Sequence, residues 1–247
     1  MTRPIKRSPS TIQPSLRLHE EDTDGADINL LAGLSDEEYA QVVAASQVRS
    51  YAVGQSVFQQ GEKHEGIFIL LSGEVRTFYV GPTGREITLA YWAPGNFVGG
   101  PELFGRGLHV WSGQATQPTQ VLQLRGPDLR SLMLNIPRLA VAMVDALAHK
   151  GKCYSALVHM LGTRSAAERL AQLILLKAKL DGKQTERGIT IKKMLTQEDL
   201  SKMVGATRQW VTATLDRLRE QGLIEGTSSQ ITILDEARLR RFAGQSN

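Results

Sequence analysis

The sequence predicts an α+β fold in which a β-barrel or sandwich precedes a long helix, two short helices and a β-hairpin. Three observations carry this prediction. Short apolar runs separated by glycine turns fill residues 51–125, which is typical of small β-barrels and sandwiches. Apolar residues recur in steps of three and four over 128–161, the period of a helix. Two helix caps then flank a glycine between residues 196 and 207.

Composition excludes several classes of protein. The chain has 247 residues, 41% hydrophobic and 22% charged, an ordinary globular balance with room for one large or two small domains. No run approaches about 18 apolar residues, and the polar, proline-bearing N-terminus lacks a secretory pattern. We therefore expect a cytoplasmic protein that does not enter the membrane. The single Cys153 supports neither an intrachain disulfide nor an iron–sulfur cluster, and five scattered histidines disfavour a metal or haem site.

The first half of the chain divides into a tail and a barrel. Residues 1–28 are polar with an acidic run, which predicts a disordered tail. Residues 29–127 form the predicted barrel domain, beginning with a helix that Ser35 and Glu38 cap and that runs to about Ser46. Ser72-Gly73 predicts a tight hairpin and Gly81–Gly84 a second turn. The expected strands are 51–58, 66–71, 74–80, 87–92, 110–117 and 119–125.

A heptad pattern marks residues 128–162 as a dimerisation helix. Its seam begins at Ile136 and Ala140 and has Lys150 as a polar exception. A helix with one apolar stripe packs against a second helix or against the barrel, and a long one does both in succession. The residues expected at a homodimer interface are Met143, Leu147, Lys150, Tyr154, Leu157 and Leu161.

The most specific pattern lies in the C-terminal domain, residues 163–247, after a helix predicted at 164–181. Thr196 caps one helix, Gly205 ends it and Thr207 caps the next, whose inner face carries Val211, Leu215 and Leu218. This is the anatomy of a helix–turn–helix, the alternative being an unrelated helix pair. Residues 223–233 read as strand, turn and strand, which predicts a wing.

Charge favours double-stranded DNA as the partner of this domain. Residues 163–247 hold 15 basic and 10 acidic side chains, whereas residues 1–162 hold 14 and 15. Arg208 has the geometry to read guanine and Gln209 to read adenine from the start of the second helix. Trp210 fits the core or the groove edge equally well. The predicted DNA-binding residues are Thr196, Thr207, Arg208, Gln209, Thr212, Ala213 and Arg217.

Four segments give the chain a resemblance to a known family. Residues 51–61, 67–75 and 95–99, together with 204–208 followed by Val211, are similar to motifs of the Crp/Fnr family of bacterial transcription regulators, over about 29–235. The resemblance implies a jelly-roll barrel of the cyclic-nucleotide-binding type, a dimerising helix and a winged helix–turn–helix. It also implies a sequence-specific homodimeric regulator, not an enzyme, that binds a palindromic operator and works with RNA polymerase. No nucleophile elbow, phosphate-binding loop or metal-spaced motif favours an enzyme.

The same resemblance implies weak or no cyclic AMP binding. Members that bind cyclic AMP carry Gly-Glu where this chain has Gly99-Gly100, and an arginine where residues 109–112 have none. The backbone at Gly99 and Gly100, followed by Pro101, instead suggests an anion nest beside aromatic side chains. We expect a small aromatic or carboxylated effector, against three alternatives: aromatics that only form core, a constitutive regulator, or atypical binding of a cyclic nucleotide. The candidate effector residues are Trp92, Phe97, Gly99, Gly100, Pro101, Glu102, His109, Trp111 and Ser112.

Overall fold

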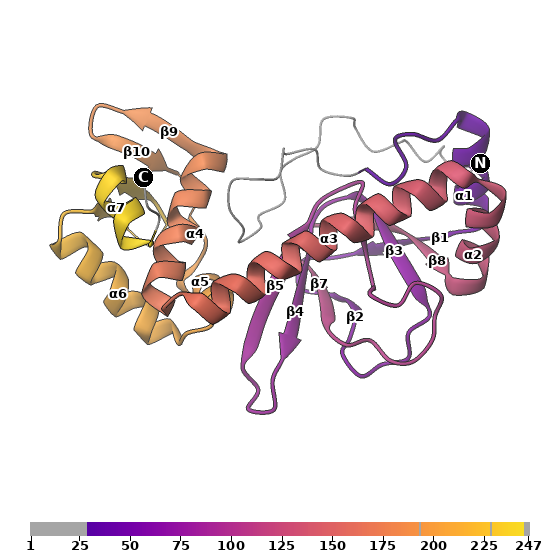
Figure 1. The fold of residues 1–247 in the computed structure, drawn as a ribbon, viewed down its shortest axis with the longest axis horizontal. Coiled ribbons are helices and arrows are strands. Elements are labelled where there is room, and N and C mark those ends of the chain that lie inside the picture. The colour runs from indigo at the N-terminus through magenta and orange to yellow at the C-terminus, as the bar shows by residue number, and fades with distance from the viewer. Residues whose placement is uncertain (1–28, 193, 228, 245–247) are drawn as a thin grey trace. The chain divides into compact units, whose positions relative to one another are not determined.

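The computed structural model describes residues 29–192, 194–227 and 229–244 (Figure 1). The tail predicted at 1–28 lies outside these residues. The described chain forms two compact units, one holding residues 29–80 and 89–154 and the other holding 81–88 and 155–244. Each unit has helices and at least one sheet, and the boundary at residues 154 and 155 falls within one long helix.

Two four-stranded sheets of the first unit form the predicted jelly roll. One sheet has the order β1 (Gln47–Tyr51), β8 (Thr119–Arg125), β3 (Gly66–Ser72) and β6 (Phe97–Val98). The other has the order β2 (Ser56–Phe58), β7 (Ser112–Ala115), β4 (Val75–Val80) and β5 (Glu86–Trp92). The single strand expected at 51–58 is two strands, β1 and β2, because Gly54 turns the chain with φ +83°.

The tight hairpin expected at Ser72-Gly73 is wrong. Strands β3 and β4 belong to different sheets, so the chain passes from one sheet to the other at this point. Gly73 has φ +81°, and a Cβ there would lie 2.4 Å from the carbonyl oxygen of Pro118. The glycine therefore makes a corner that no other residue would fit without strain.

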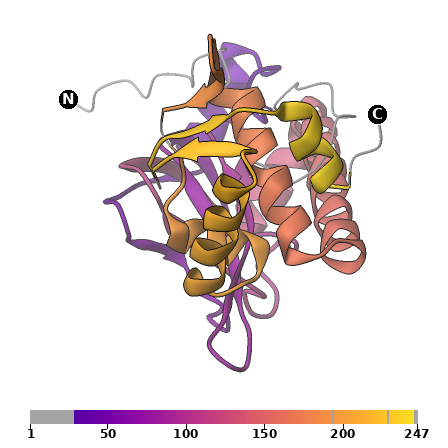
Figure 2. The same ribbon diagram turned by 90° about the vertical axis from the view of Figure 1, so that its left-hand side faces the viewer.

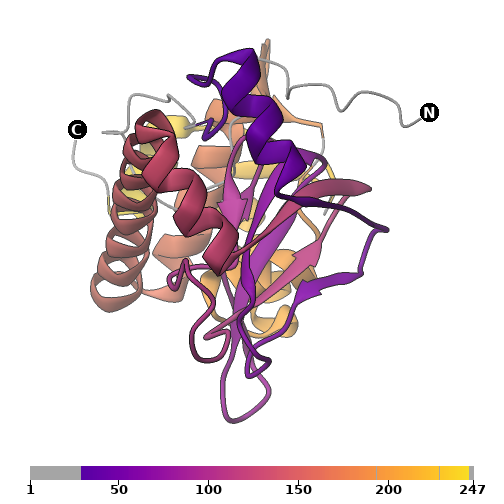
Figure 3. The same ribbon diagram turned by 90° about the vertical axis from the view of Figure 1, so that its right-hand side faces the viewer.

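Three helices cover the sheet that contains β3 (Figure 3). Helix α1 (Asp36–Ala44) begins at the predicted capping box, where the Glu38 N–H donates to Ser35 Oγ at 3.1 Å. The helical stretch expected over 128–161 is two helices, α2 (Gly126–Asn135) and α3 (Pro137–Thr163), bent by 119° where Pro137 starts the second. No single described helix is long and apolar enough to cross a membrane, and this bent pair meets only the length and composition test.

The second unit contains one four-stranded sheet with the order β11, β12, β10 and β9 (Figure 2). Strands β11 (Ile224–Gly226) and β12 (Ile231–Ile233) are the predicted wing. Strands β9 (Gly182–Thr185) and β10 (Gly188–Ile191) extend it, although their short and mostly polar sequence gave no strand signal. The helices of this unit are α4 (Ala166–Asp181), α5 (Gln197–Val204), α6 (Arg208–Glu220) and α7 (Glu236–Phe242).

Candidate functional site

Helices α5 and α6 form a helix–turn–helix whose ends are held by hydrogen bonds. Thr196 Oγ1 accepts from the Asp199 N–H at 3.1 Å, and Thr207 Oγ1 accepts from the Trp210 N–H at 3.2 Å. Gly205 ends α5 in the left-handed conformation, with φ 65° and ψ 45°. The two threonine caps and the left-handed glycine that the sequence predicted at the turn are therefore confirmed.

The inner faces of the two helices separate core from surface. Leu200 and Met203 on α5 and Val211, Leu215 and Leu218 on α6 are at most 1% exposed. Burial of these five side chains fixes the rotation of α6 about its axis. The side chains left exposed include six of the seven predicted DNA-binding residues, namely Thr196, Thr207, Arg208, Gln209, Ala213 and Arg217.

Thr212, the seventh, is half-buried and already engaged within the motif. Its hydroxyl donates to Gln197 Oε1 at 2.8 Å and approaches the Arg208 carbonyl oxygen at 3.1 Å. Arg219 donates to the Gly226 carbonyl oxygen at 3.0 Å and so ties α6 to the wing. Trp210 is half-buried, between the two alternatives that its sequence position left open.

Arg169 on α4 positions this motif, and sequence reasoning missed it. Its Nε and Nη2 donate to the Val204 carbonyl oxygen at 3.0 and 2.8 Å, and its Nη1 donates to the Arg164 carbonyl oxygen at 2.7 Å. The guanidinium thus satisfies a carbonyl at the C-terminus of α5, where a positive charge is favourable. No sequence signal pointed to it, because the two residues are 35 positions apart.

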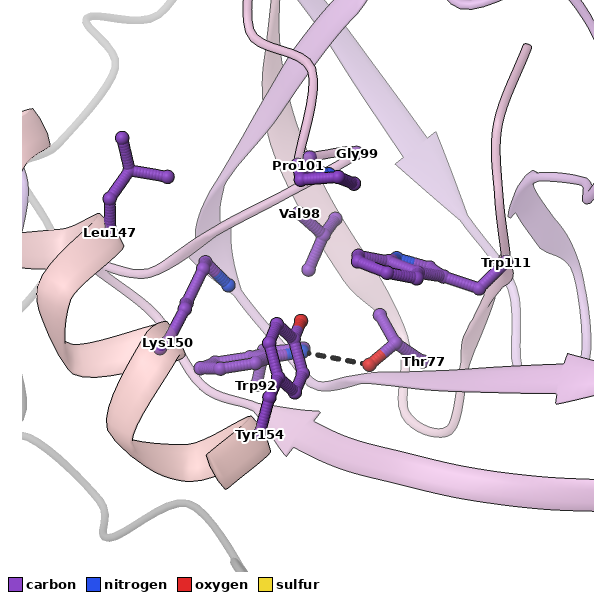
Figure 4. Close-up of a pocket in the computed structure, with 11 residues that line it drawn as sticks. Thr77, Trp92, Val98, Gly99, Pro101, Trp111, Leu147, Lys150 and Tyr154 are labelled. Carbon is purple, nitrogen blue, oxygen red and sulfur yellow. Dashed lines mark hydrogen bonds between the residues drawn. The ribbon is translucent and has the colours of Figure 1, made fainter. Parts of the chain in front are cut away.

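A cavity of about 170 Å³ lies in the first unit between the jelly roll and α3 (Figure 4). The barrel contributes tryptophans and loop backbone, and α3 contributes one face over residues 147–154. The indole N–H of Trp92 donates to Thr77 Oγ1 at 3.0 Å, which fixes the ring that forms one wall. The lining residues are Thr77, Trp92, Val98, Gly99, Gly100, Pro101, Trp111, Leu147, Lys150, Gly151 and Tyr154.

Five of the nine candidate effector residues line this cavity: Trp92, Gly99, Gly100, Pro101 and Trp111. The other four have different surroundings. Phe97 is fully buried, and the Glu102 carboxylate accepts from the Phe104 N–H at 2.9 Å. Ser112 Oγ accepts from the Gln60 N–H at 3.0 Å. The ninth, His109, belongs to a neighbouring pair of histidines.

His109 and His64 lie in contact next to the glycine loop of the cavity, with their rings tilted at 42°. Their ring centroids are 4.4 Å apart, and Phe58 stacks on the other side of His109 at 4.5 Å. His64 Nε2 lies 2.5 Å from the Gly99 carbonyl oxygen, so the pair holds the loop backbone. Neither Nδ1 atom has a hydrogen-bond partner within the described part of the chain. The pKa of His109 is lowered to about 4. The larger cause is burial of the ring, and the smaller is electrostatic repulsion from the nearby His64.

The six residues expected at a dimer interface mostly face inward. Met143 is fully buried in the barrel core, Leu157 is 4% exposed and Leu161 is half-buried. Leu147, Lys150 and Tyr154 line the cavity. The barrel therefore takes most of the stripe, which is the alternative that the sequence left open. Helix α3 exposes a different row, spaced by three and four, consisting of Val141, Val144, Ala148, Gly151, Ser155 and Val158.

No group of three or more histidine, cysteine, aspartate or glutamate side chains in the described ranges could hold a metal ion. Cys153 is buried, with Sγ 3.7 Å from Nε2 of His149 on the preceding turn of α3. The chemistry available at the cavity is therefore that of one ammonium group, aromatic rings, hydroxyls and backbone.

Two family models match the chain. The model described as "Cyclic nucleotide-binding domain" matches residues 48–135, and "Crp-like helix-turn-helix domain" matches residues 168–242. Among curated relatives, the "Cyclic AMP receptor protein" of Thermus thermophilus is 26% identical over 214 residues, which cover 87% of this chain and 96% of the relative. A "CRP-like cAMP-activated global transcriptional regulator" of Mycobacterium tuberculosis is 25% identical over the same shares of both chains.

Solved structures agree on the fold. A CooA variant from Carboxydothermus hydrogenoformans matches with a TM-score of 0.72 at 24% identity, over 92% of this chain and 99% of that chain. A transcriptional regulator of the CRP family from Thermus thermophilus matches with a TM-score of 0.62 at 26% identity, over 80% of this chain and 97% of that one. The named relatives are regulators of transcription and not enzymes.

Proposed function

Because the chain belongs to the Crp/Fnr family of transcription regulators, with a Crp-like helix–turn–helix for DNA binding, we propose that it binds a palindromic operator as a homodimer. The observation that carries the proposal is the rotation of α6. One face of α6 packs into the core of the second unit, whereas the side chains of Arg208 and Gln209, at its N-terminus, are exposed. A recognition helix inserts that end into the major groove.

Each exposed side chain has a proposed role set by its chemistry. Arg208 reads guanine O6 and N7, and Gln209 reads adenine N6 and N7. Thr207 and Arg217 contact phosphates, whereas Thr196, whose hydroxyl donates to Asp199 Oδ2 at 2.6 Å, acts mainly as the cap of α5. The small Ala213 allows close approach to the bases or a thymine methyl group. Thr212 acts mainly by holding α6 against α5, because Gln197 already accepts from its hydroxyl.

Selection of bound sequences from random duplex DNA by the full-length protein tests this function. We expect a two-fold symmetric site whose half-sites are about one helical turn, or 34 Å, apart. Arg208→Ala should weaken binding to that site by about 5- to 150-fold and relax the preference at one base pair. Arg130→Ala, an equal loss of charge on α2, is the matched control. Selection of no common sequence, or equal effects of the two variants, would refute the assignment.

The exposed row on α3 supports a homodimer. Val141, Val144 and Val158 are 61, 62 and 69% exposed, and three small residues, Ala148, Gly151 and Ser155, lie between Val144 and Val158 on the same face. Small side chains let two helix backbones approach closely, and valines at heptad spacing supply the apolar contact. We therefore place the dimer contact on this row, one position away from the stripe that covers the barrel.

The cavity supports control by a small molecule other than cyclic AMP. No arginine is found among the described residues that line it, and Gly100 stands where cyclic-AMP-binding members of the family carry glutamate. Effector binding acts by favouring the dimer state in which both recognition helices match the operator, which requires different affinities for the two states. A regulator of this kind works in the cytoplasm with RNA polymerase. If operator affinity responds to no ligand, the constitutive alternative is correct.

A further inference from the structure

The ammonium group of Lys150 is the one charged group that the cavity wall carries among the described lining residues. Lys150 is 6% exposed, and its Nζ lies 3.2 Å from the ring centroid of Trp92 and 4.6 Å from that of Phe97. A cation over an aromatic face is attracted to it, most strongly when both are desolvated. Since Trp92 is itself fixed by its hydrogen bond to Thr77, the positive charge has a defined place in the wall.

The remaining wall is suited to a flat ring. The ring centroids of Trp111 and Tyr154 are 5.5 Å apart, with the ring planes at 57°. Tyr154 packs edge-on against Trp92, with 6.5 Å between the centroids and 80° between the planes (Figure 4). Aromatic side chains in such arrangements accept a further ring by stacking or edge contact. Burial raises the pKa of Tyr154, so its hydroxyl remains a neutral donor next to this space.

The size of the cavity limits its occupant. At about 170 Å³ it is close to the roughly 150 Å³ of a cavity that accommodates benzene. A cyclic nucleotide adds a ribose and a phosphate ring to a purine and is far larger. One six-membered ring with a short anionic substituent matches both the space and the charge.

We propose that this cavity binds a small monocyclic aromatic carboxylate, whose carboxylate is held by Lys150 and whose ring packs against Trp92 and Trp111. The inference rests on the proposed function, in which the barrel senses an effector. The positive charge then comes from α3 rather than from the barrel segment at residues 109–112. A carboxylate beside an ammonium gains a charge-assisted hydrogen bond, which is among the stronger polar contacts in a protein.

A ligand-charge series on the unaltered full-length protein tests the inference without any variant. Calorimetry compares benzoate and phenylacetate with the neutral benzamide and benzyl alcohol, the cationic benzylamine, and cyclic AMP. We expect millimolar or tighter binding of a carboxylate, weakened by about tenfold or more when the carboxylate becomes an amide. No carboxylate binding at millimolar concentration, or equal binding of acid and amide, would overturn the inference.

Variants of Lys150 locate the contact. Lys150→Met keeps the aliphatic length and removes the charge, so it should weaken carboxylates by about 10- to 150-fold and leave benzamide unchanged within about threefold. Lys150→Arg should retain a preference for the acid, and Lys152→Met, two residues further along α3 and exposed, should have no effect. Trp111→Ala should weaken acid and amide alike. Thermal melting of each variant reports folding, and equal carboxylate affinity in Lys150→Met would place the anion elsewhere.

Parallel gel shifts separate this inference from the proposed function. If the protein binds DNA sequence-specifically but binds no carboxylate, the proposed function is supported and the proposed ligand class is refuted. Binding of cyclic AMP with a change in operator affinity also refutes the ligand class, while keeping an effector-controlled regulator. A carboxylate that binds without altering operator affinity supports the site and refutes its role as an effector site.

Discussion

Aspartate in place of Val144 or Val158 should break the dimer without unfolding the chain. The two valines are 62 and 69% exposed in the isolated chain, so neither contributes much to its core. Full burial of a valine side chain is worth about 1.5–3 kcal/mol, so covering some 60% of it is worth about 1–2 kcal/mol. In a symmetric dimer this burial energy is lost once in each protomer, and the two new carboxylates also repel each other. The loss of about 2–4 kcal/mol weakens association by about 30- to 1000-fold.

Sedimentation velocity across a dilution series measures this shift in the monomer–dimer equilibrium. Val53→Asp is the matched control, because Val53 is 63% exposed and lies in the turn between β1 and β2, outside the exposed row of α3. Thermal melting of both α3 variants at low protein concentration should match that of the control. If Val144→Asp and Val158→Asp associate as tightly as the control, the exposed row is not the dimer contact and the reasoning fails.

Three further changes test the motif and the histidine pair. Thr207→Ala removes the cap of α6 and should cost about 1 kcal/mol of unfolding free energy, seen by chemical denaturation, whereas Thr207→Ser should restore most of it. Gly205→Ala forces a side chain into φ +65° and should cost about 1 kcal/mol, with lower operator affinity; unchanged stability would contradict the turn geometry. The pKa of His109 is about 4 in the folded protein against 6.5 when exposed, so the unfolded chain binds more protons between these values. Stability should therefore fall as the pH falls from 6.5 to 4, and His109→Phe should flatten this slope in a series of melts; an unchanged slope would exclude His109 as its source.

The second unit could be predicted in detail because its signals are local. Caps at Thr196 and Thr207, the left-handed Gly205 and the apolar spacing of α6 act over three to seven residues. In the structure, α5 and α6 begin at Gln197 and Arg208, directly after the two caps, and α5 ends at Val204, directly before Gly205. The β9–β10 hairpin had no such signal, because β10 is held by pairing with β12 and β9 by pairing with β10 rather than by their own composition.

The first unit shows where local reasoning fails. Ser72-Gly73 has the composition of a hairpin turn, yet β3 pairs with β6 and β8 while β4 pairs with β7. The pairing of strands distant in sequence decides this, because each sheet must bury its apolar face against the other. A turn sequence alone does not reveal which sheet the next strand joins.

Sequence alone determined that the chain combines a jelly-roll domain, a long helix and a winged helix–turn–helix, and that its C-terminal part carries the excess positive charge. Only the tertiary structure decided how α3 is rotated. The part of its heptad stripe from Met143 to Tyr154 faces the barrel, which turns Lys150 into the cavity and leaves the valine row exposed. Periodicity specifies that a helix has an apolar face, but the partner of that face depends on residues far away in sequence. When one helix carries two neighbouring apolar stripes, only the packed structure shows which of them covers the barrel and which stays exposed.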